Sequence, residues 1–230
     1  MNTILFIDIE TVSLTRDFEA LPERLKAHWE KKASFFKREE PYEELYFERA
    51  AIYAEFGRVL CIGVGGFYEN GTRLKVSSLY AEDEKELLIS FKELVEKHPA
   101  GKNLILCAHN GKEFDFPYLC RRMLINGIPL PGVLNISGKK PWEIQHLDTL
   151  EMWKFGDFKH YTSLDLLASV FDIPGSKGTM DGSEVNSEYY LHAHVDKIRE
   201  YCREDVVVLA QLYRKLSGKS LIAEENIMRA

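Results

Sequence analysis

The sequence has few cysteines, no long hydrophobic run and no excess of basic residues. Its four cysteines lie far apart, and no pair has the spacing of a metal or redox site, so we expect reduced core thiols in a cytoplasmic protein. The longest apolar runs are no longer than a strand, which argues against a transmembrane helix and against a membrane partner. Because 36 Asp and Glu outnumber 30 Lys and Arg, any binding of nucleic acid must depend on local patches or on metal ions.

Apolar, β-branched runs alternate with helical patterns along the chain, which is typical of an α/β fold. The turn Glu69-Asn70-Gly71 predicts a hairpin between two of the strands, so the sheet is expected to be mixed. We expect strands at residues 3–10, 58–67, 73–80, 103–108 and 145–149. We expect helices at residues 84–98, 116–126, 163–171 and 195–216.

Residues 14–55 interrupt this alternation. The stretch is charged, aromatic and helical in pattern, so we expect a helical insertion after the first strand. Residues 131–143 and 174–187 are rich in Gly, Pro and Ser and are expected to form loops. The length fits one domain, and we expect residues 1–230 to form it.

Two acidic residues end the first predicted strand. Asp8 and Glu10 are two positions apart, so both side chains leave the same face. The nearby sequence has no Lys or Arg to offset their repulsion, and a hard divalent cation is a natural partner. The alternative is a solvated strand end. A second Asp-x-Glu, Asp17 and Glu19 in the insertion, has no assigned role.

A third carboxylate follows the buried strand predicted at residues 103–108. Ligands of α/β proteins gather at the carboxyl ends of parallel strands, and Asp115 lies between such a strand and the next helix. If the two strands are neighbours, Asp115 reaches the first two acids. The alternative is that Asp115 caps the helix.

A fourth carboxylate lies within the last long helix. Tyr201 and Asp205 are four residues apart on a face that is otherwise apolar, where a carboxylate is costly unless it is paired or binds a metal. The alternative is an Asp205 bonded to a neighbour. Tyr161 and Asp165 have the same spacing, but there Thr162 and Asp165 resemble a capping box, which explains the acid locally.

These residues, in this order, resemble the three motifs of the DEDD 3′–5′ exonucleases. Tyrosine at position 201 is typical of the DEDDy branch, which includes the proofreading domains of DNA polymerases, and no catalytic position departs from its pattern. Five further segments resemble bacterial stand-alone proteins described as predicted 3′–5′ exonucleases related to the exonuclease domain of family B polymerases. These segments are residues 140–143, 146–149, 153–156, 161–164 and 181–185. The resemblance implies a ribonuclease H-like fold.

The resemblance also implies an enzyme that hydrolyses single-stranded DNA or RNA from the 3′ end and releases nucleoside 5′-monophosphates. Two Mg²⁺ or Mn²⁺ ions would lie roughly 3.5–4 Å apart, one activating water and the other stabilising the leaving oxygen. Tyr201 would position the attacking water. The implied metal ligands are Asp8, which bridges the ions, Glu10, Asp115 and Asp205.

Residues beside these acids are candidates to hold the 3′-terminal nucleotide. We expect contacts to its sugar or base, and we expect Asn110 to orient substrate or a carboxylate. The candidates for the sugar or base are Ile9, Thr11 and Phe114.

Basic residues gather at residues 121–122, 139–140 and 154–160. Lys139 and Lys140 lie near Trp142, and an aromatic ring with basic neighbours suits a strand-tracking patch. We expect the Arg121–Arg122 pair to be a solvated face.

Three further features have local explanations. His192 and His194 are expected at the surface. Asp181 is expected to form a turn followed by a cap, although the resemblance leaves a role at the edge of the site open for it. Asp148 either caps the following helix or braces the site.

Two other functions use the same features. The first is a nucleic-acid-binding module without catalysis, against which the complete set of acids and the tyrosine argue. The second is a metal-dependent phosphatase or oligonucleotidase acting on short substrates, which the same metal chemistry would serve. The sequence does not decide between DNA and RNA, because no motif reports a contact to the 2′ position, and it predicts no protein partner.

Overall fold

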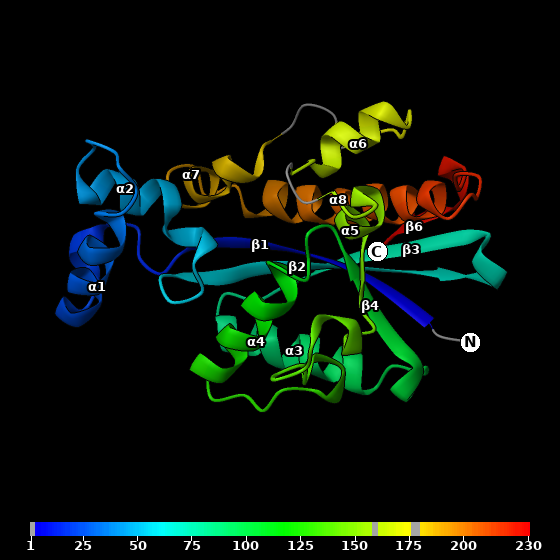
Figure 1. Ribbon diagram of the computed structural model, residues 1–230, viewed down its shortest axis with the longest axis horizontal. Coiled ribbons are helices and arrows are strands. Elements are labelled where there is room, and N and C mark those ends of the chain that lie inside the picture. The colour runs from blue at the N-terminus through cyan, green and yellow to red at the C-terminus, as the bar shows by residue number, and fades with distance from the viewer. Residues whose placement is uncertain (1–2, 158–160, 176–179) are drawn as a thin grey trace.

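The computed structural model describes residues 3–157, 161–175 and 180–230. At its centre is a six-stranded mixed sheet in the order β5-β4-β1-β2-β3-β6 (Figure 1). Strand β1 pairs with β2 in antiparallel and with β4 in parallel orientation, and β2 and β3 form the expected hairpin. The α/β prediction is therefore confirmed. The strands are β1 (Thr3–Ser13), β2 (Gly57–Tyr68), β3 (Arg73–Tyr80), β4 (Leu104–Ala108), β5 (Leu147–Asp148) and β6 (Ile227–Arg229).

Helices cover both faces of the sheet. In Figure 1, α3 and α4 lie on one side of the sheet, and the long α8 runs along the other side, with α5 against it and α6 beyond it. Alternate residues of β1 face these two layers: Ile7 and Ile9 pack with α3 and α4, whereas Phe6 packs with α8. The helices of these layers are α3 (Glu84–Glu96), α4 (Asp115–Ile125), α5 (Thr149–Lys154), α6 (Leu164–Val170) and α8 (Val195–Leu216).

The helical insertion expected after β1 is present. It contains α1 (Glu23–Ala33) and α2 (Tyr42–Arg49) and projects to one side of the sheet in Figure 1. Trp29 is fully buried at its centre, where its indole Nε1 donates to the Tyr42 carbonyl and its ring packs edge-on against Tyr46. The insertion thus has an aromatic core of its own.

Helix α8 approaches the sheet closely because β2 presents two glycines to it. A Cβ on Gly63 would lie 2.7 Å from the Cys202 carbonyl oxygen, and one on Gly65 would lie 2.7 Å from Val206. Real Cβ atoms do not approach so closely, so only glycine permits this helix position. The close packing fixes α8 over β1 and β2.

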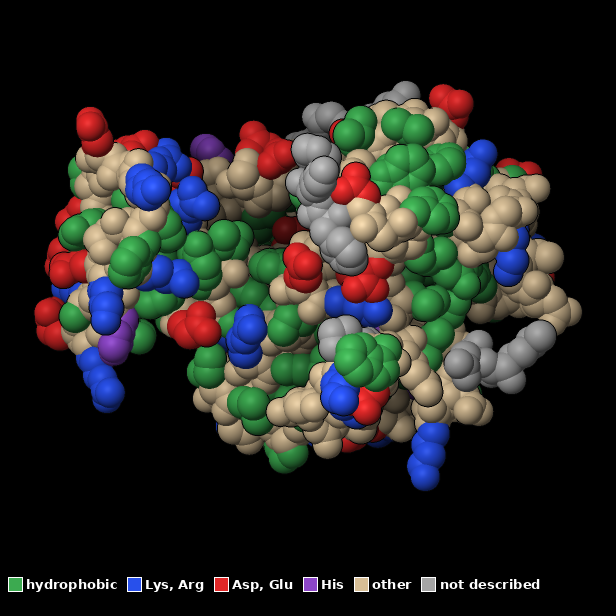
Figure 2. All heavy atoms as spheres, viewed as in Figure 1, with side chains coloured by type: hydrophobic (Ala, Val, Ile, Leu, Met, Phe, Trp, Pro, Cys, Tyr) green, Lys and Arg blue, Asp and Glu red, His purple; other side chains and the backbone are tan. Residues whose placement is uncertain are grey.

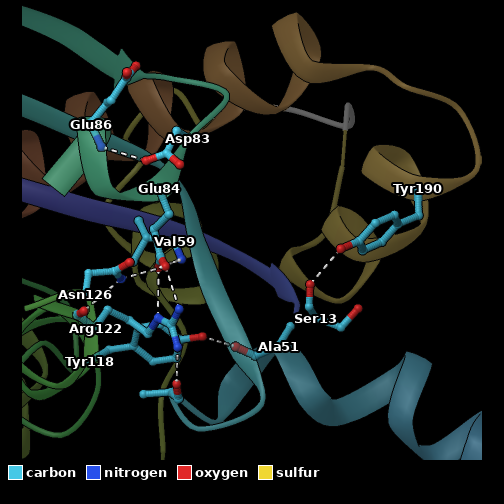
Figure 3. Close-up of polar contacts among 11 residues, drawn as sticks. Ser13, Ala51, Val59, Asp83, Glu84, Glu86, Tyr118, Arg122, Asn126 and Tyr190 are labelled. Atoms are coloured by element: carbon cyan, nitrogen blue, oxygen red, sulfur yellow. Dashed lines mark hydrogen bonds and ion pairs between the residues drawn. The ribbon is translucent and has the colours of Figure 1, made fainter. Parts of the chain in front are cut away.

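A buried ion pair joins α3, α4, β2 and the end of the insertion (Figure 3). The Arg122 guanidinium donates to both oxygens of Glu84, at 2.9 and 2.5 Å, and to the Ala54 carbonyl at 2.8 Å. Glu84 also accepts from the Val59 N–H and the Asn126 side chain. The prediction of a solvated face is therefore wrong for Arg122, because the adjacent Arg121 alone is exposed.

Several short elements differ from the expectations. Helix α7 (Val185–Tyr190) begins inside the stretch predicted as a loop. Strand β6 was not expected, and α5 was anticipated only through the capping role considered for Asp148. The cap of α6 is Ser163, whose hydroxyl accepts from the Leu166 N–H, so the capping role predicted for Thr162 is wrong. Asp181 does form a capping box with Glu184, as expected of that turn.

The cysteines and the apolar segments of the chain were the subject of two expectations from composition. Cys61, Cys107 and Cys202 are buried, as expected of core thiols, whereas Cys120 is only half-buried. Across the described ranges, no helix combines the length and apolar character needed to traverse a bilayer.

Candidate active site

A cleft of about 880 Å³ opens between the insertion, the end of β1, the segment after β4, and helices α6 and α8. On the face drawn in Figure 2, a hollow separates the insertion at the left from the segments at the upper right. The cleft brings together all nine site residues predicted from the sequence. They are Asp8, Ile9, Glu10, Thr11, Asn110, Phe114, Asp115, Tyr201 and Asp205.

The first two acids reach the cleft because of strand alternation. Asp8 pairs with Gly63 and Glu10 with Cys61 across the β1–β2 ladder, and both lie in the same alternating series as Phe6, which packs on the α8 side. The register shifts between Glu10 and Thr11. Glu10 is only 7% exposed, so its carboxylate lies at the base of the cleft.

Asp115 enters the cleft from the first turn of α4. The cap position of this helix is Phe114, and Asp115 is its first helical residue, so the alternative prediction that Asp115 is the cap is wrong. Burial raises the pKa of Asp115 to about 7, while backbone hydrogen bonds from its own N–H and from Ile9 oppose the increase. The bond from Ile9 ties α4 to β1 next to Asp8 and Glu10.

The four carboxylates influence one another. Burial raises the pKa of Asp8 well above its ordinary value, and the charges of Asp205 and Asp115 raise it further. Burial likewise raises the pKa of Glu10, with the Asp8 charge as the next cause. The Asp205 charge therefore lies near the acids of β1, and all four acids line the same cleft.

One oxygen of this cluster lacks a partner. Asp8 Oδ2 is buried and has no hydrogen-bond partner among the described residues. A buried carboxylate oxygen without a partner is costly unless a proton or a cation is present. Clustered carboxylate oxygens suit hard divalent cations such as Mg²⁺ and Mn²⁺, so these residues fit the implied metal site.

Cys202 lies within the cluster but does not complete a metal site. Its Sγ is within 4.8 Å of ligand atoms of Asp8 and Glu10. Burial raises the pKa of the Cys202 thiol well above its ordinary value, and the thiol lies 3.5 Å from the Asp8 carbonyl, to which it donates. A protonated thiol is a poor ligand, which leaves the carboxylates as the donor set.

Tyr201 stands beside Asp205 on α8. Burial raises the pKa of Tyr201, and the charges of Asp205 and Glu10 and a hydrogen bond to Asp205 raise it further. The phenol is therefore neutral at physiological pH and serves as a hydrogen-bond donor.

Asp148 both caps a helix and braces the cleft, which joins the two alternatives predicted for it. Its carboxylate accepts from Leu150 at the start of α5. It also accepts from the N–H groups of Asn110 and Lys112, at 2.9 and 3.0 Å. The Asn110 backbone is left-handed, with φ of 61°, and these bonds hold that turn in place.

His109 and Tyr161 also line the cleft, although neither was predicted from the sequence as a site residue. His109 Nε2 lies 2.8 Å from the Thr162 carbonyl, so this nitrogen carries the proton, and Nδ1 accepts from Thr149. Burial lowers the pKa of His109, which favours the neutral ring. Tyr161 packs edge-on against His109 and lines the cleft, although the sequence offered only a local explanation for its segment.

The other side of the cleft comes from the insertion, through Glu48, Arg49, Ala51 and Ile52. No motif in the sequence identifies these residues. One signal was available: the positions three and four residues from Arg49 hold no acid, which leaves its charge without a partner on α2.

The predicted basic patches lie elsewhere or are only partly described. Lys139, Lys140 and Trp142 are exposed and do not line the cleft, although the Lys140 ammonium lies 5.2 Å from the centre of the Trp142 ring. Part of the stretch 154–160 falls outside the described residues. His192 and His194 are exposed, as expected.

The family B DNA polymerase from the hyperthermophilic archaeon Pyrobaculum calidifontis has a similar fold, with a TM-score of 0.59 and 17% sequence identity. The match covers 94% of this chain and 25% of the polymerase, so the chain spans about a quarter of that protein. A comparison with curated proteins found no match.

A family model matches residues 52–220, a stretch that includes Asp115, Tyr201 and Asp205 but begins after Asp8 and Glu10. Its description is a predicted 3′–5′ exonuclease related to the exonuclease domain of PolB. The matched stretch is well over half of the 230 residues. The chain belongs to the family of predicted 3′–5′ exonucleases related to the exonuclease domain of PolB.

Proposed function

We propose that this chain is a metal-dependent 3′–5′ exonuclease of the DEDDy type. It hydrolyses single-stranded DNA or RNA from the 3′ end and releases nucleoside 5′-monophosphates. Residues 1–230 form one exonuclease domain that carries the helical insertion. The four free cysteines support a cytoplasmic location.

One observation carries the proposal: four carboxylates from β1, α4 and α8 lie in one cleft, where burial and the charges of Asp205 and Asp115 raise the pKa of Asp8 and of Glu10. A cleft of this charge repels a polyanion until cations are bound. Binding of nucleic acid at these acids therefore requires divalent cations, and activity is expected to depend strictly on them.

The four carboxylates of the cluster are the proposed metal ligands. Asp8, Glu10, Asp115 and Asp205 would hold two Mg²⁺ or Mn²⁺ ions, and Asp8 Oδ2, which has no partner among the described residues, would be one of the oxygens that bind them. The ions, when bound, supply an activated water and stabilise the charge on the leaving oxygen. The carboxylates fix the positions at which this occurs.

Tyr201 positions the attacking water with its neutral hydroxyl. A phenol with a raised pKa is not a base at neutral pH, so Tyr201 orients the water and does not take its proton. Asn110 orients the substrate. Thr11 and Phe114 line the cleft beside the acids and contact the terminal sugar and base, and Ile9, whose side chain packs with α3 and α4, borders the cleft between Asp8 and Glu10.

The test uses DNA and RNA oligomers labelled at the 5′ end, with Mg²⁺, Mn²⁺ or a chelator. We expect a ladder of products shortened from the 3′ end, with no products in the chelator. Binding without cleavage would favour the non-catalytic module. Turnover confined to very short substrates would favour the oligonucleotidase.

Removing a proposed ligand tests the metal assignment. Asp8→Ala and Asp205→Ala should each lower the rate by more than about 100-fold, because even residues that only support metal ligands cost 10- to 100-fold. Circular dichroism should show an intact fold in both variants. Rates like that of the wild type would refute the assignment.

A further inference from the structure

The cleft is lined by many more acidic than basic side chains, although the protein is proposed to bind nucleic acid. Among its described lining residues, Arg49 is the one Lys or Arg. Cations held by the acids would neutralise only the phosphate being cleaved. The other phosphates of a strand in the cleft would still need a positively charged group. The carboxylates that line the cleft are Asp8, Glu10, Glu48, Asp115, Asp165, Asp181 and Asp205.

Arg49 has no anionic partner within the described part of the chain. No ion pair found there includes its guanidinium, and its Nε is buried without a hydrogen-bond partner. The neighbouring Glu48 is bonded to Arg38, at 2.7 Å. An unpaired guanidinium with a buried donor is costly, so the arrangement favours an anion that arrives from outside.

Aromatic rings hold this arginine in place. The guanidinium carbon lies 4.9 Å from the centre of the Phe36 ring, and Phe36 stacks on Tyr53 at 6.3 Å with an angle of 11° between the rings. The Lys32 ammonium lies 3.8 Å from the centre of the Tyr53 ring. A planar guanidinium on a ring loses little further freedom on binding and matches the geometry of a phosphate.

We infer that Arg49 binds a backbone phosphate of the nucleic acid strand in the cleft. The helical insertion then has a function, because it supplies the positive charge that the wall of acids lacks. This inference rests on the proposed function. The other role available to Arg49 is to stabilise the C-terminal end of α2 through its dipole, and the experiment separates the two.

The experiment measures the affinity of the full chain for a single-stranded oligomer by filter binding, with Ca²⁺ in place of Mg²⁺ to suppress hydrolysis, over a range of salt concentrations. Arg49→Gln should bind about 10-fold more weakly, and the slope of log affinity against log salt should fall by about 0.7, the value for one phosphate contact on a single strand. The matched control is Arg24→Gln, which removes the same charge from an exposed position of the insertion outside the cleft. It should behave as the wild type does.

A second measurement identifies the phosphate. Phosphates of the oligomer are replaced one at a time by neutral methylphosphonates. At one position the replacement should weaken binding to the wild type but not to Arg49→Gln. Equal losses in both proteins at every position would overturn the inference, as would equal slopes for Arg49→Gln and Arg24→Gln.

The result also distinguishes this inference from the proposed function. If the wild type shortens 3′ ends and Arg49→Gln binds as the control does, only the inference fails. If the wild type neither binds nor cleaves, the proposed function fails and the inference with it. Should Arg49→Gln not fold, Arg49→Lys keeps the charge without the planar fork; we expect an unchanged salt slope with weaker binding, and unchanged affinity would overturn the inference.

Discussion

At the scale of single residues, burial and nearby negative charges keep the Tyr201 hydroxyl protonated. It lies next to Asp205 and close enough to Glu10 that both charges raise its pKa. A hydroxyl that stays protonated can donate a hydrogen bond at every pH at which the protein is folded. Its contribution to the proposed reaction is therefore one of geometry.

Replacing Tyr201 by Phe removes this donor and keeps the ring. We expect kcat to fall by about 10- to 100-fold, because a misplaced reactant costs rates of this order. The affinity for Mn²⁺, measured by calorimetry, should change by less than about twofold, because the carboxylates remain. Loss of Mn²⁺ binding would indicate that Tyr201 has a structural role.

Asp148 has a wider role than its sequence position indicates. It is 3% exposed, and it accepts from the turn before α4 as well as from α5. That turn carries Asn110 and leads to Asp115. The side chain therefore connects the stability of α5 with the position of one wall of the cleft.

Asp148→Ala should lower the free energy of unfolding by about 2 kcal/mol, since it removes a cap and leaves buried donors unpaired. It should also raise KM or lower kcat for 3′ hydrolysis. The matched control is Asp83→Ala, which removes the cap of α3 on the other side of the sheet (Figure 3). It should cost about 1 kcal/mol and leave hydrolysis unchanged; equal kinetic effects in both variants would contradict the positioning role.

Site residues could be predicted from the sequence where functional side chains lie a few positions apart in a spacing that matches a strand or a helix. Asp8 with Glu10 and Tyr201 with Asp205 were found because two and four residues define one face of a strand and of a helix. Arg122 was misjudged because its partner, Glu84, is 38 residues away. Arg49 was missed because its place in the cleft depends on how the insertion folds back onto the sheet.

At the scale of elements, the contact between α8 and β2 sets the distance between Asp205 and the acids of β1. Gly63 and Gly65 leave no side chain between the helix and the strand. Gly63 also donates its backbone N–H to the Cys202 thiol. Gly63 and Gly65 therefore determine how close α8, and with it Asp205, lies to the sheet.

Gly63→Ala should move α8 away from the strand. Overpacking at such a contact costs about 1–3 kcal/mol, and we expect weaker Mn²⁺ binding because Asp205 shifts with the helix. Gly66→Ala is the matched control, since a Cβ there meets only the Ile4 carbonyl oxygen at 3.8 Å. Urea unfolding and calorimetry measure both effects, and similar values for the two variants would show that the close approach is not required.

Long patterns favoured the prediction of an element, although the two-residue β5 was also expected. The 22 residues of α8 show a clear helical period, whereas α5 and α7 have six residues each and complete fewer than two turns. Strand β6 has three residues and exists because it pairs with β3. Its formation is a tertiary effect that no local pattern reports.

At the scale of the whole molecule, we expect the carboxylate cluster to make stability depend on pH and, if it binds metal as proposed, on divalent cations. An acid whose pKa is raised on folding holds its proton more tightly in the folded than in the unfolded chain. The stability of the metal-free protein is therefore highest where these acids are protonated and falls as the pH rises. For Asp115 the fall extends from about pH 4, its unfolded pKa, to its folded pKa of about 7.

Thermal unfolding in a chelator should show this fall. At pH 7.5, Mn²⁺ at 100 times its dissociation constant should restore about 2.7 kcal/mol, and at pH 5 it should restore much less because protons compete for the ligands. Asp8→Asn should flatten the pH profile and remove most of the effect of Mn²⁺. A wild-type profile that does not change with pH or with Mn²⁺ would contradict the clustered arrangement.

The acids of the cleft come from β1, α4 and α8, which are spread over nearly the whole chain. While the ribosome is still making the polypeptide, Asp8 and Glu10 emerge long before Asp205. No fragment that stops short of α8 contains the full set of carboxylates, so a nascent or prematurely terminated chain cannot assemble them. The hydrolysis proposed for this cleft therefore requires that translation has passed the final long helix.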